Sequence, residues 1–237
     1  MRILIIRHGE PDYEKDSLTP RGWQEAEILS KYLKDMKIDS FYVSPLGRAQ
    51  DTIKATMDIL NREPIVLPWL KEFSHVKVAR PDSEEKTIAW DWLPKDWTTD
   101  ESYYLENQWY QTDIMKDTNI YEEYQKVVEG LDTLLAEHGY VRDGRTYKAV
   151  RPNKKCIALV CHFGLESLII GHLLGISPMI LWHGFIAMPT SITSIYTEER
   201  TKGIASFRIN CFGGIPHLDI ANEEPSFSGR FMEVYEE

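Results

Sequence analysis

Short runs of branched apolar residues recur along the chain, each closed by a polar residue, a glycine or a proline. Residues 3–6 form the first run and residues 157–161 form a later one. Such runs are typical of strands that are buried on both faces, as in parallel sheets covered by helices. Shorter runs at 38–43 and 65–67 predict two further strands of the same sheet.

Between these strands, apolar residues return at helical spacing. Thr19 followed by Pro20 predicts a helix that reaches about Asp35, because threonine is a good N-cap and proline suits the first turn. Ser44-Pro45 repeats this signature before a helix that is expected to reach about Leu60. The alternation of strands and helices predicts an α/β fold with a parallel sheet and right-handed crossovers.

The middle of the chain interrupts this pattern. Residues 80–119 hold four tryptophans among tyrosines and acids with no clean period, which predicts an inserted segment. Residues 139–155 are expected to form a polar loop or hairpin, and the tail after Gly214 to be irregular. With 237 residues, one domain spanning 1–237 can carry such an insert. The other expected elements are helices at about 120–138 and 165–174 and a strand pair at 192–196 and 204–211.

Composition narrows the choice of ligand. The formal net charge of -10 argues against a nucleic-acid partner or an anionic membrane surface, because both require a positive field. A few arginines in a cleft would still suit a small anion. The basic stretch from Arg142 to Lys155 most often marks a solvated face, although a phosphate-bearing ligand could use it. No apolar stretch approaches the roughly 20 residues of a membrane-spanning helix, so a cytoplasmic protein is expected.

Charged residues stand where the predicted strands end. Arg7 and His8 directly follow the first strand, and His162 directly follows the strand at 157–161. Arg48 falls in the first turn of the helix after the second strand. Because the carboxyl ends of parallel strands meet at one edge of a sheet, we expect these side chains to surround one point. Two histidines and two arginines form a pocket for a dianionic group, and a phosphoryl group fits the guanidinium forks.

At these residues the chain resembles the histidine phosphatase superfamily, also called phosphoglycerate mutase-like. The resemblance implies a three-layer α/β/α sandwich with a mostly parallel central sheet and an inserted cap segment. The motifs fall in the family's order and leave the tryptophan-rich insert uncovered. They are Arg7-His8-Gly9-Glu10, Leu18-Thr19 with Gly22, Gln24 and Ala26, the segment from Ser44 to Thr52, Leu70-Lys71-Glu72, and Val160-Cys161-His162-Phe163-Gly164.

The resemblance also implies roles. His8 is the nucleophile that becomes a phosphohistidine, and Arg7, Arg48 and His162 hold the phosphoryl oxygens. Glu72 protonates the leaving oxygen and then activates the hydrolytic water. No metal and no other cofactor is needed. The residues expected to contact the substrate are Arg7, Glu10, Arg48, His162 and Phe163.

The favoured function is that of a metal-independent phosphatase that hydrolyses a small phosphomonoester. A phosphoglycerate mutase is the close rival, but residues 11–17 are too short a loop to hold a second phosphate position. A regulatory module that only binds phosphorylated partners is a further alternative. The insert at about 80–119 is the predicted substrate cap, and His75 is either a pocket or a surface residue. His172 and His183 are expected in helix and loop positions, and a homodimer is left open.

Overall fold

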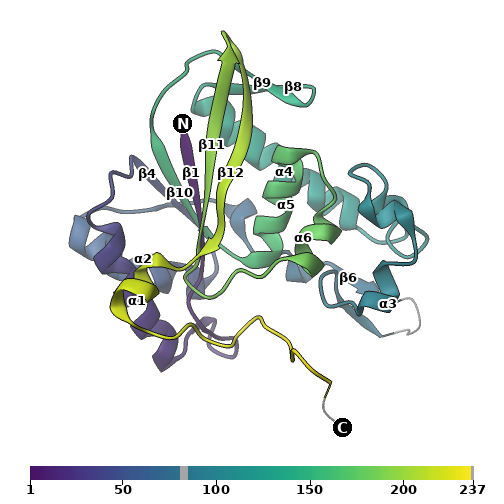
Figure 1. Ribbon diagram of the computed structural model, residues 1–237, viewed down its shortest axis with the longest axis horizontal. Helices are drawn as coiled ribbons and strands as arrows, with labels where there is room; N and C mark the ends of the chain where they lie inside the picture. Colours follow the sequence, from purple (N-terminus) through teal and green to yellow (C-terminus); the bar gives the residue numbers. More distant parts are fainter. Residues whose placement is uncertain (81–84, 236–237) are drawn as a thin grey trace.

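A mixed sheet forms the centre of the protein. The computed structural model describes residues 1–80 and 85–235, and in this part eight strands join in the order β5-β4-β10-β1-β11-β12-β9-β8 (Figure 1). Their bounds are β1 Arg2–Arg7, β4 Ser40–Val43, β5 Ile65–Val66, β8 Tyr140–Asp143, β9 Thr146–Ala149, β10 Cys156–Cys161, β11 Ile192–Thr201 and β12 Ile204–Gly214.

The parallel part of the sheet lies where the apolar runs predicted it. β5, β4, β10 and β1 run parallel, and the register of the central pair sets Leu4 opposite Ala158 and Arg7 opposite Cys161. From β11 onward the pairs are antiparallel. The expectation of a sheet that is mostly parallel is therefore confirmed for its centre, while hairpins complete one edge.

Helices cover both faces of the sheet, which confirms the three-layer arrangement. Successive residues of β1 point to opposite faces, so Leu4 and Ile6 pack in one apolar cluster and Ile3 and Ile5 in another. The first cluster lies under helices α1 and α2, and the second under α4 and α5, as Figure 1 shows on either side of the sheet. The bounds are α1 Pro20–Leu33, α2 Gly47–Leu60, α4 Ile120–Glu137 and α5 Phe163–Leu174.

Some boundaries differ from the expectations. α2 begins at Gly47, so Ser44-Pro45 does not open it as predicted. Helix α6 (Pro178–Gly184) was not expected. The tail predicted to be irregular contains α7 (Pro216–Ala221), which packs on α1. Ser177-Pro178 at the start of α6 and Pro216 at the start of α7 carry the same local signals as Ser44-Pro45, so these signals alone do not locate a helix start.

The tryptophan-rich insert forms short elements around α5 and α6 rather than a unit of its own. They are β6 Lys77–Ala79, β7 Lys86–Ile88, α3 Pro94–Trp97 and single 3₁₀ turns at Glu101–Tyr104 and Trp109–Gln111. Residues 81–84 of the insert lie outside the described residues. Within the segment 139–155, residues 140–149 form the β8–β9 hairpin, one of the two predicted forms. Among the described residues no helix is long and apolar enough to cross a membrane.

Candidate active site

Two histidines face each other at the carboxyl edge of the parallel strands. β1 and β10 are in register at Arg7 and Cys161, so the next residues, His8 and His162, emerge side by side. Their ring centroids are 5.0 Å apart, and their exposed fractions are 2% and 0%. The structure thus brings together the two strand-end histidines that the sequence singled out.

His8 has the protonation state that a nucleophile requires. Its Nδ1 lies 2.7 Å from the backbone oxygen of Gly9. A carbonyl oxygen only accepts hydrogen bonds, so Nδ1 carries the proton and Nε2 keeps its lone pair. Burial, followed by the charge of Arg7, holds the pKa of His8 well below its ordinary value. The imidazole is therefore neutral near pH 7.

His162 is oriented by a residue that the sequence pattern had assigned to a helix cap. The Ser44 hydroxyl lies 2.7 Å from Nε2 of His162 and also accepts a hydrogen bond from the Leu46 amide at 3.2 Å. Burial and the neighbouring His8 lower the pKa of His162. Its buried Nδ1 has no partner among the described residues. Such an atom is costly to leave unpaired, and it is available to a ligand oxygen.

The two arginines are fixed at one end and keep donors free. Nη1 of Arg7 donates to the Ala187 carbonyl at 2.5 Å. Nη1 of Arg48 pairs with Asp16 at 2.6 Å, and not with the nearby Asp51. Each guanidinium has five N–H groups, so most of them remain available for an anion. The positive charges of Arg7 and Arg48 both lower the pKa of His8, so both guanidinium groups lie near its ring.

The Glu72 carboxylate reaches the start of α5. Oε1 accepts hydrogen bonds from the amides of Phe73 at 2.8 Å and Leu165 at 3.1 Å, and Oε2 accepts one from Gly164 at 3.4 Å. A Cβ at Gly164 would lie 2.7 Å from Oε1, so only glycine allows this approach. Burial raises the pKa of Glu72, although these amides and the arginines oppose the shift. Glu72 therefore keeps a proton to a higher pH than an exposed glutamate.

A family model described as the histidine phosphatase superfamily (branch 1) matches residues 3–210. The chain belongs to this superfamily. The family predicted from the strand-end motifs is therefore confirmed, and with it the phosphatase type of enzyme. The match also spans the tryptophan-rich insert that the motifs left uncovered.

Known members of the superfamily resemble this chain to different extents. The adenosylcobalamin/alpha-ribazole phosphatase of Escherichia coli (strain K12) is 24% identical over 199 residues, 77% of this chain and 84% of that protein. A 2,3-bisphosphoglycerate-dependent phosphoglycerate mutase of Thermoplasma acidophilum is 33% identical over 72 residues, and the match spans 26% of this chain and 36% of that enzyme. The crystal structure of a phosphoserine phosphatase from Entamoeba histolytica has a TM-score of 0.59 at 20% identity and covers 92% of this chain and 98% of its own. This likeness confirms the fold.

Both carboxylate oxygens of Glu10 are already engaged. Oε1 accepts a hydrogen bond from Thr19 at 2.8 Å, and Oε2 accepts one from Ser226. Glu10 thus ties the start of α1 to the C-terminal segment, and its contact with substrate stays a prediction. Phe163, at the start of α5, packs partly buried against the core, and its substrate contact is likewise a prediction.

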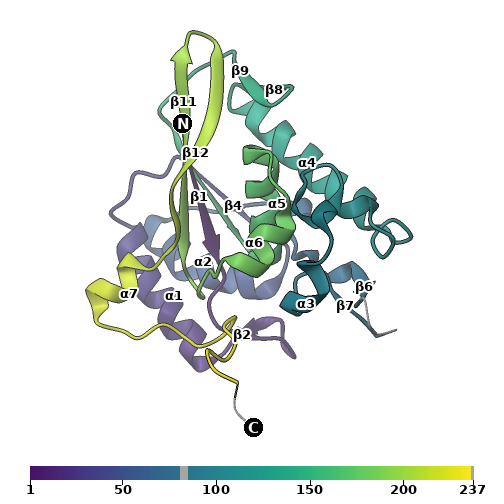
Figure 2. The same cartoon turned by 45° about the vertical axis from the view of Figure 1, so that its right-hand side comes forward.

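The C-terminal segment passes over Arg7, a contact that the sequence did not predict. Figure 2 shows it returning along α1 toward β2 (Pro11–Asp12). A Cβ at Gly229 would lie 2.6 Å from Nη1 of Arg7, and the φ angle of Gly229 is +88°. The glycine thus allows the backbone to pass against the guanidinium. The local sequence pattern does not predict this contact, because the segment packs against residues about 220 positions away in the chain.

The insert reaches the same site from the other side. A Cβ at Gly164 would meet the Trp90 ring at 2.7 Å, and the Trp182 indole donates to the Gly164 carbonyl at 2.9 Å. Trp90 and Trp182 pack with ring centroids 5.9 Å apart. The insert therefore lies against the turn that carries His162.

A second buried carboxylate was missed because it lies in an apolar helix. Glu166 is 1% exposed, and burial raises its pKa to about 7 while the charge of Arg7 opposes the shift.

The other histidines have separate partners. His75 pairs with Glu123 at 2.7 Å, His172 with Asp132 at 3.0 Å, and His183 stacks on Trp97. In the described part of the chain, no group of three or more His, Cys, Asp or Glu side chains is arranged to hold a metal ion.

Proposed function

We propose that the protein hydrolyses a small phosphomonoester through a phosphohistidine on His8. The observation that carries this proposal is the neutral, buried His8, whose Nδ1 is held by the Gly9 carbonyl and whose ring faces His162 at 5.0 Å. A neutral imidazole with a free Nε2 lone pair is a competent nucleophile. Arg7 and Arg48 supply the positive charge that a dianionic phosphoryl group requires.

In the first step, Nε2 of His8 attacks phosphorus and the ester P–O bond breaks. Arg7, Arg48 and His162 hold the three non-bridging oxygens, and catalysis rests mainly on this positioning and charge. The leaving oxygen takes the proton of Glu72, whose raised pKa keeps that proton available. The products of this step are a free alcohol, a phosphohistidine and an ionised Glu72.

In the second step, water attacks the phosphohistidine. The Glu72 carboxylate accepts a proton from the water, the P–N bond breaks, and His8 returns to its neutral state. Inorganic phosphate then leaves. The cycle needs no group beyond the substrate, water and the side chains of this chain.

Two segments are proposed to select the substrate. The insert brings Trp90 against the start of α5, and the C-terminal segment brings Gly229 against Arg7. Both limit the space beside the phosphate pocket, which favours a small ester. One structural relative is named a phosphoserine phosphatase, and phosphoserine is a compound of this size class.

The rival function is a mutase, which the partial match to the Thermoplasma enzyme favours. The loop after His8 argues against a mutase, because it is too short to hold a second phosphate position. It forms a tight hairpin of β2 and β3 (Ser17–Leu18), whose register pairs Pro11 with Leu18. To separate the two functions, 2- or 3-phosphoglycerate is supplied, and interconversion is measured beside phosphate release. Fast interconversion would overturn the proposed hydrolysis.

The direct test is a hydrolysis screen over phosphorylated metabolites, with His8→Ala as the blank. Protein quenched without acid after brief exposure to labelled substrate should carry one phosphate on His8 by mass spectrometry. An absent adduct, together with turnover by the parent protein no higher than that of the His8→Ala blank, would instead favour a module that only binds phosphorylated partners. Because His8 contributes the attacking lone pair, turnover in the variant should fall by at least about 10³-fold.

A further inference from the structure

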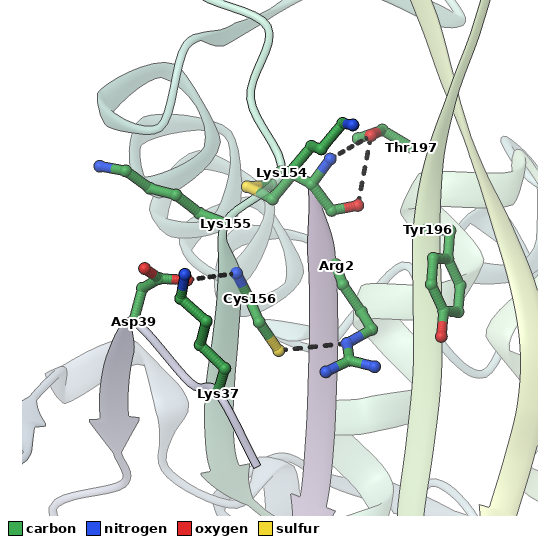
Figure 3. A pocket seen from close by; sticks show the side chains of 9 residues that line it. Arg2, Lys37, Asp39, Lys154, Lys155, Cys156, Tyr196 and Thr197 are labelled. Carbon is green, nitrogen blue, oxygen red and sulfur yellow. Dashed lines mark hydrogen bonds between the residues drawn. The ribbon is translucent and has the colours of Figure 1, made fainter.

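A concave site lies at the opposite edge of the sheet from His8 and His162. It is a depression of about 640 Å³ at the amino ends of β1 and β10 (Figure 3). Arg2, at its floor, is separated from His8 by the length of β1, or roughly 20 Å at the usual rise of a strand. Its lining residues are Met1, Arg2, Lys37, Asp39, Lys154, Lys155, Cys156, Tyr196 and Thr197.

The lining of this basic depression is positively charged in a chain with a net charge of -10. It holds one arginine, three lysines and a single acid. That acid, Asp39, uses its carboxylate to accept a hydrogen bond from the Cys156 amide at 2.8 Å. Over residues 1–80 and 85–235, none of Lys37, Lys154 and Lys155 forms an ion pair. Their charge is thus left for a ligand, and Figure 3 shows Lys154 and Lys155 near the amino end of β10.

Arg2 is already positioned. Its Nε donates to Sγ of Cys156 at 3.2 Å, and its guanidinium carbon lies 6.0 Å from the centre of the Tyr196 ring. Figure 3 shows the guanidinium between these two side chains. An arginine that is held in this way loses little side-chain entropy on binding and offers its remaining N–H groups to phosphate oxygens. The adjacent Tyr196 is 38% exposed, and its ring offers a surface for stacking.

We propose that the basic depression binds a nucleoside polyphosphate. The phosphates would lie on Arg2, Lys154 and Lys155, and the base would stack on Tyr196. The volume is within the usual range for small-molecule sites, about 300–1,000 Å³. A polyanion would also relieve the mutual repulsion of the clustered cations. This site assigns a function to Lys154 and Lys155, the last two residues of the basic stretch, which the catalytic site does not use.

The test is calorimetric titration of ADP into the His8→Ala protein, which cannot consume it. Lys154→Ala/Lys155→Ala should abolish one binding event or weaken it at least tenfold. Lys31→Ala/Lys34→Ala removes the same charge from two exposed residues at the C-terminal end of α1, neither of which lines the depression, and should change the affinity by less than about twofold. Equal titration curves for all three proteins, or no ADP binding at all, would overturn the proposal. So would an equal loss in the control, which would indicate a general effect of charge.

A second pair of titrations tests the nucleoside part. Tyr196→Ala should weaken ADP severalfold and leave pyrophosphate unchanged, because pyrophosphate has no ring to stack. If both ligands respond alike, the assignment of the base to Tyr196 is wrong. Hydrolysis by the lysine variants in an otherwise unaltered chain should equal that of the parent protein, which also verifies folding. Failure of the proposed phosphatase function would leave these binding results unaffected.

Discussion

Replacing Gly164 by alanine isolates the contribution of the Glu72 position to catalysis. The new Cβ would lie 2.7 Å from both Glu72 Oε1 and the Trp90 ring, whereas ordinary contacts begin at 3.4 Å. The carboxylate and the ring must therefore each move away from the new Cβ by about 0.7 Å, unless the backbone of residue 164 shifts instead. A misplacement of about 1 Å in a reacting group can cost on the order of 10²-fold, so kcat should fall by roughly 10- to 100-fold.

Stability should respond far less than activity. Alanine is a better helix former than glycine by up to about 1 kcal/mol, which opposes an overpacking cost of about 1–3 kcal/mol. The free energy of unfolding should thus fall by no more than about 2 kcal/mol. Gly184→Ala is the matched control, because a Cβ at this α6 position meets nothing within 4 Å. It should leave both kcat and stability nearly unchanged.

The assay is steady-state hydrolysis of the best substrate from the screen, beside denaturant unfolding. Glu72→Gln supplies the double-mutant cycle. If Gly164→Ala acts through Glu72, adding it to Glu72→Gln should lower kcat little further. Independent, multiplicative losses in the cycle would refute this reasoning, as would a Gly164→Ala protein with the kcat of the parent.

Three other changes have defined outcomes. Burial raises the pKa of Glu72, so the rate of the first step should fall as pH rises through that pKa, and Glu72→Gln should remove this alkaline limb from pre-steady-state profiles. Gly229→Ala should raise KM severalfold by displacing the segment against Arg7, whereas Gly203→Ala, with a similar φ of +81° but open space, should not. Burial lowers the pKa of His217 to about 4, so the unfolded state binds the extra proton between pH 6.5 and 4. Stability is complete above pH 6.5 and should fall by up to about 3 kcal/mol by pH 4, a loss that urea titrations should find reduced in His217→Gln.

Much of the site could be predicted because its residues are fixed to strand ends. Arg7, His8 and His162 follow apolar runs, and parallel pairing of these runs carries them to one edge. Arg48 follows from the same logic through the helix after β4. The end of each apolar run marks the end of a strand, so the local sequence alone places these residues at the edge of the sheet.

Ser44 illustrates the opposite case. Its sequence context, a serine before a proline and an apolar helix, is that of an N-cap, and propensity alone favours that assignment. In the structure the hydroxyl contacts His162, 118 residues away, and the helix starts three residues later. The hydroxyl thus gives the buried Nε2 of His162 a partner, which would be costly to leave unpaired, whereas water can hydrate a helix end at the surface.

The sequence by itself determined the strands, the alternating helices and the charged residues at the carboxyl edge, because each depends on the local order of apolar and polar side chains. Only the tertiary structure decided what surrounds that edge: Ser44 on His162, Glu72 on the start of α5, and Gly229 on Arg7. It also gathered Arg2, Lys154 and Lys155 at the opposite edge. These contacts join residues far apart in the chain, and their free energies arise from burial and charge that exist only after folding.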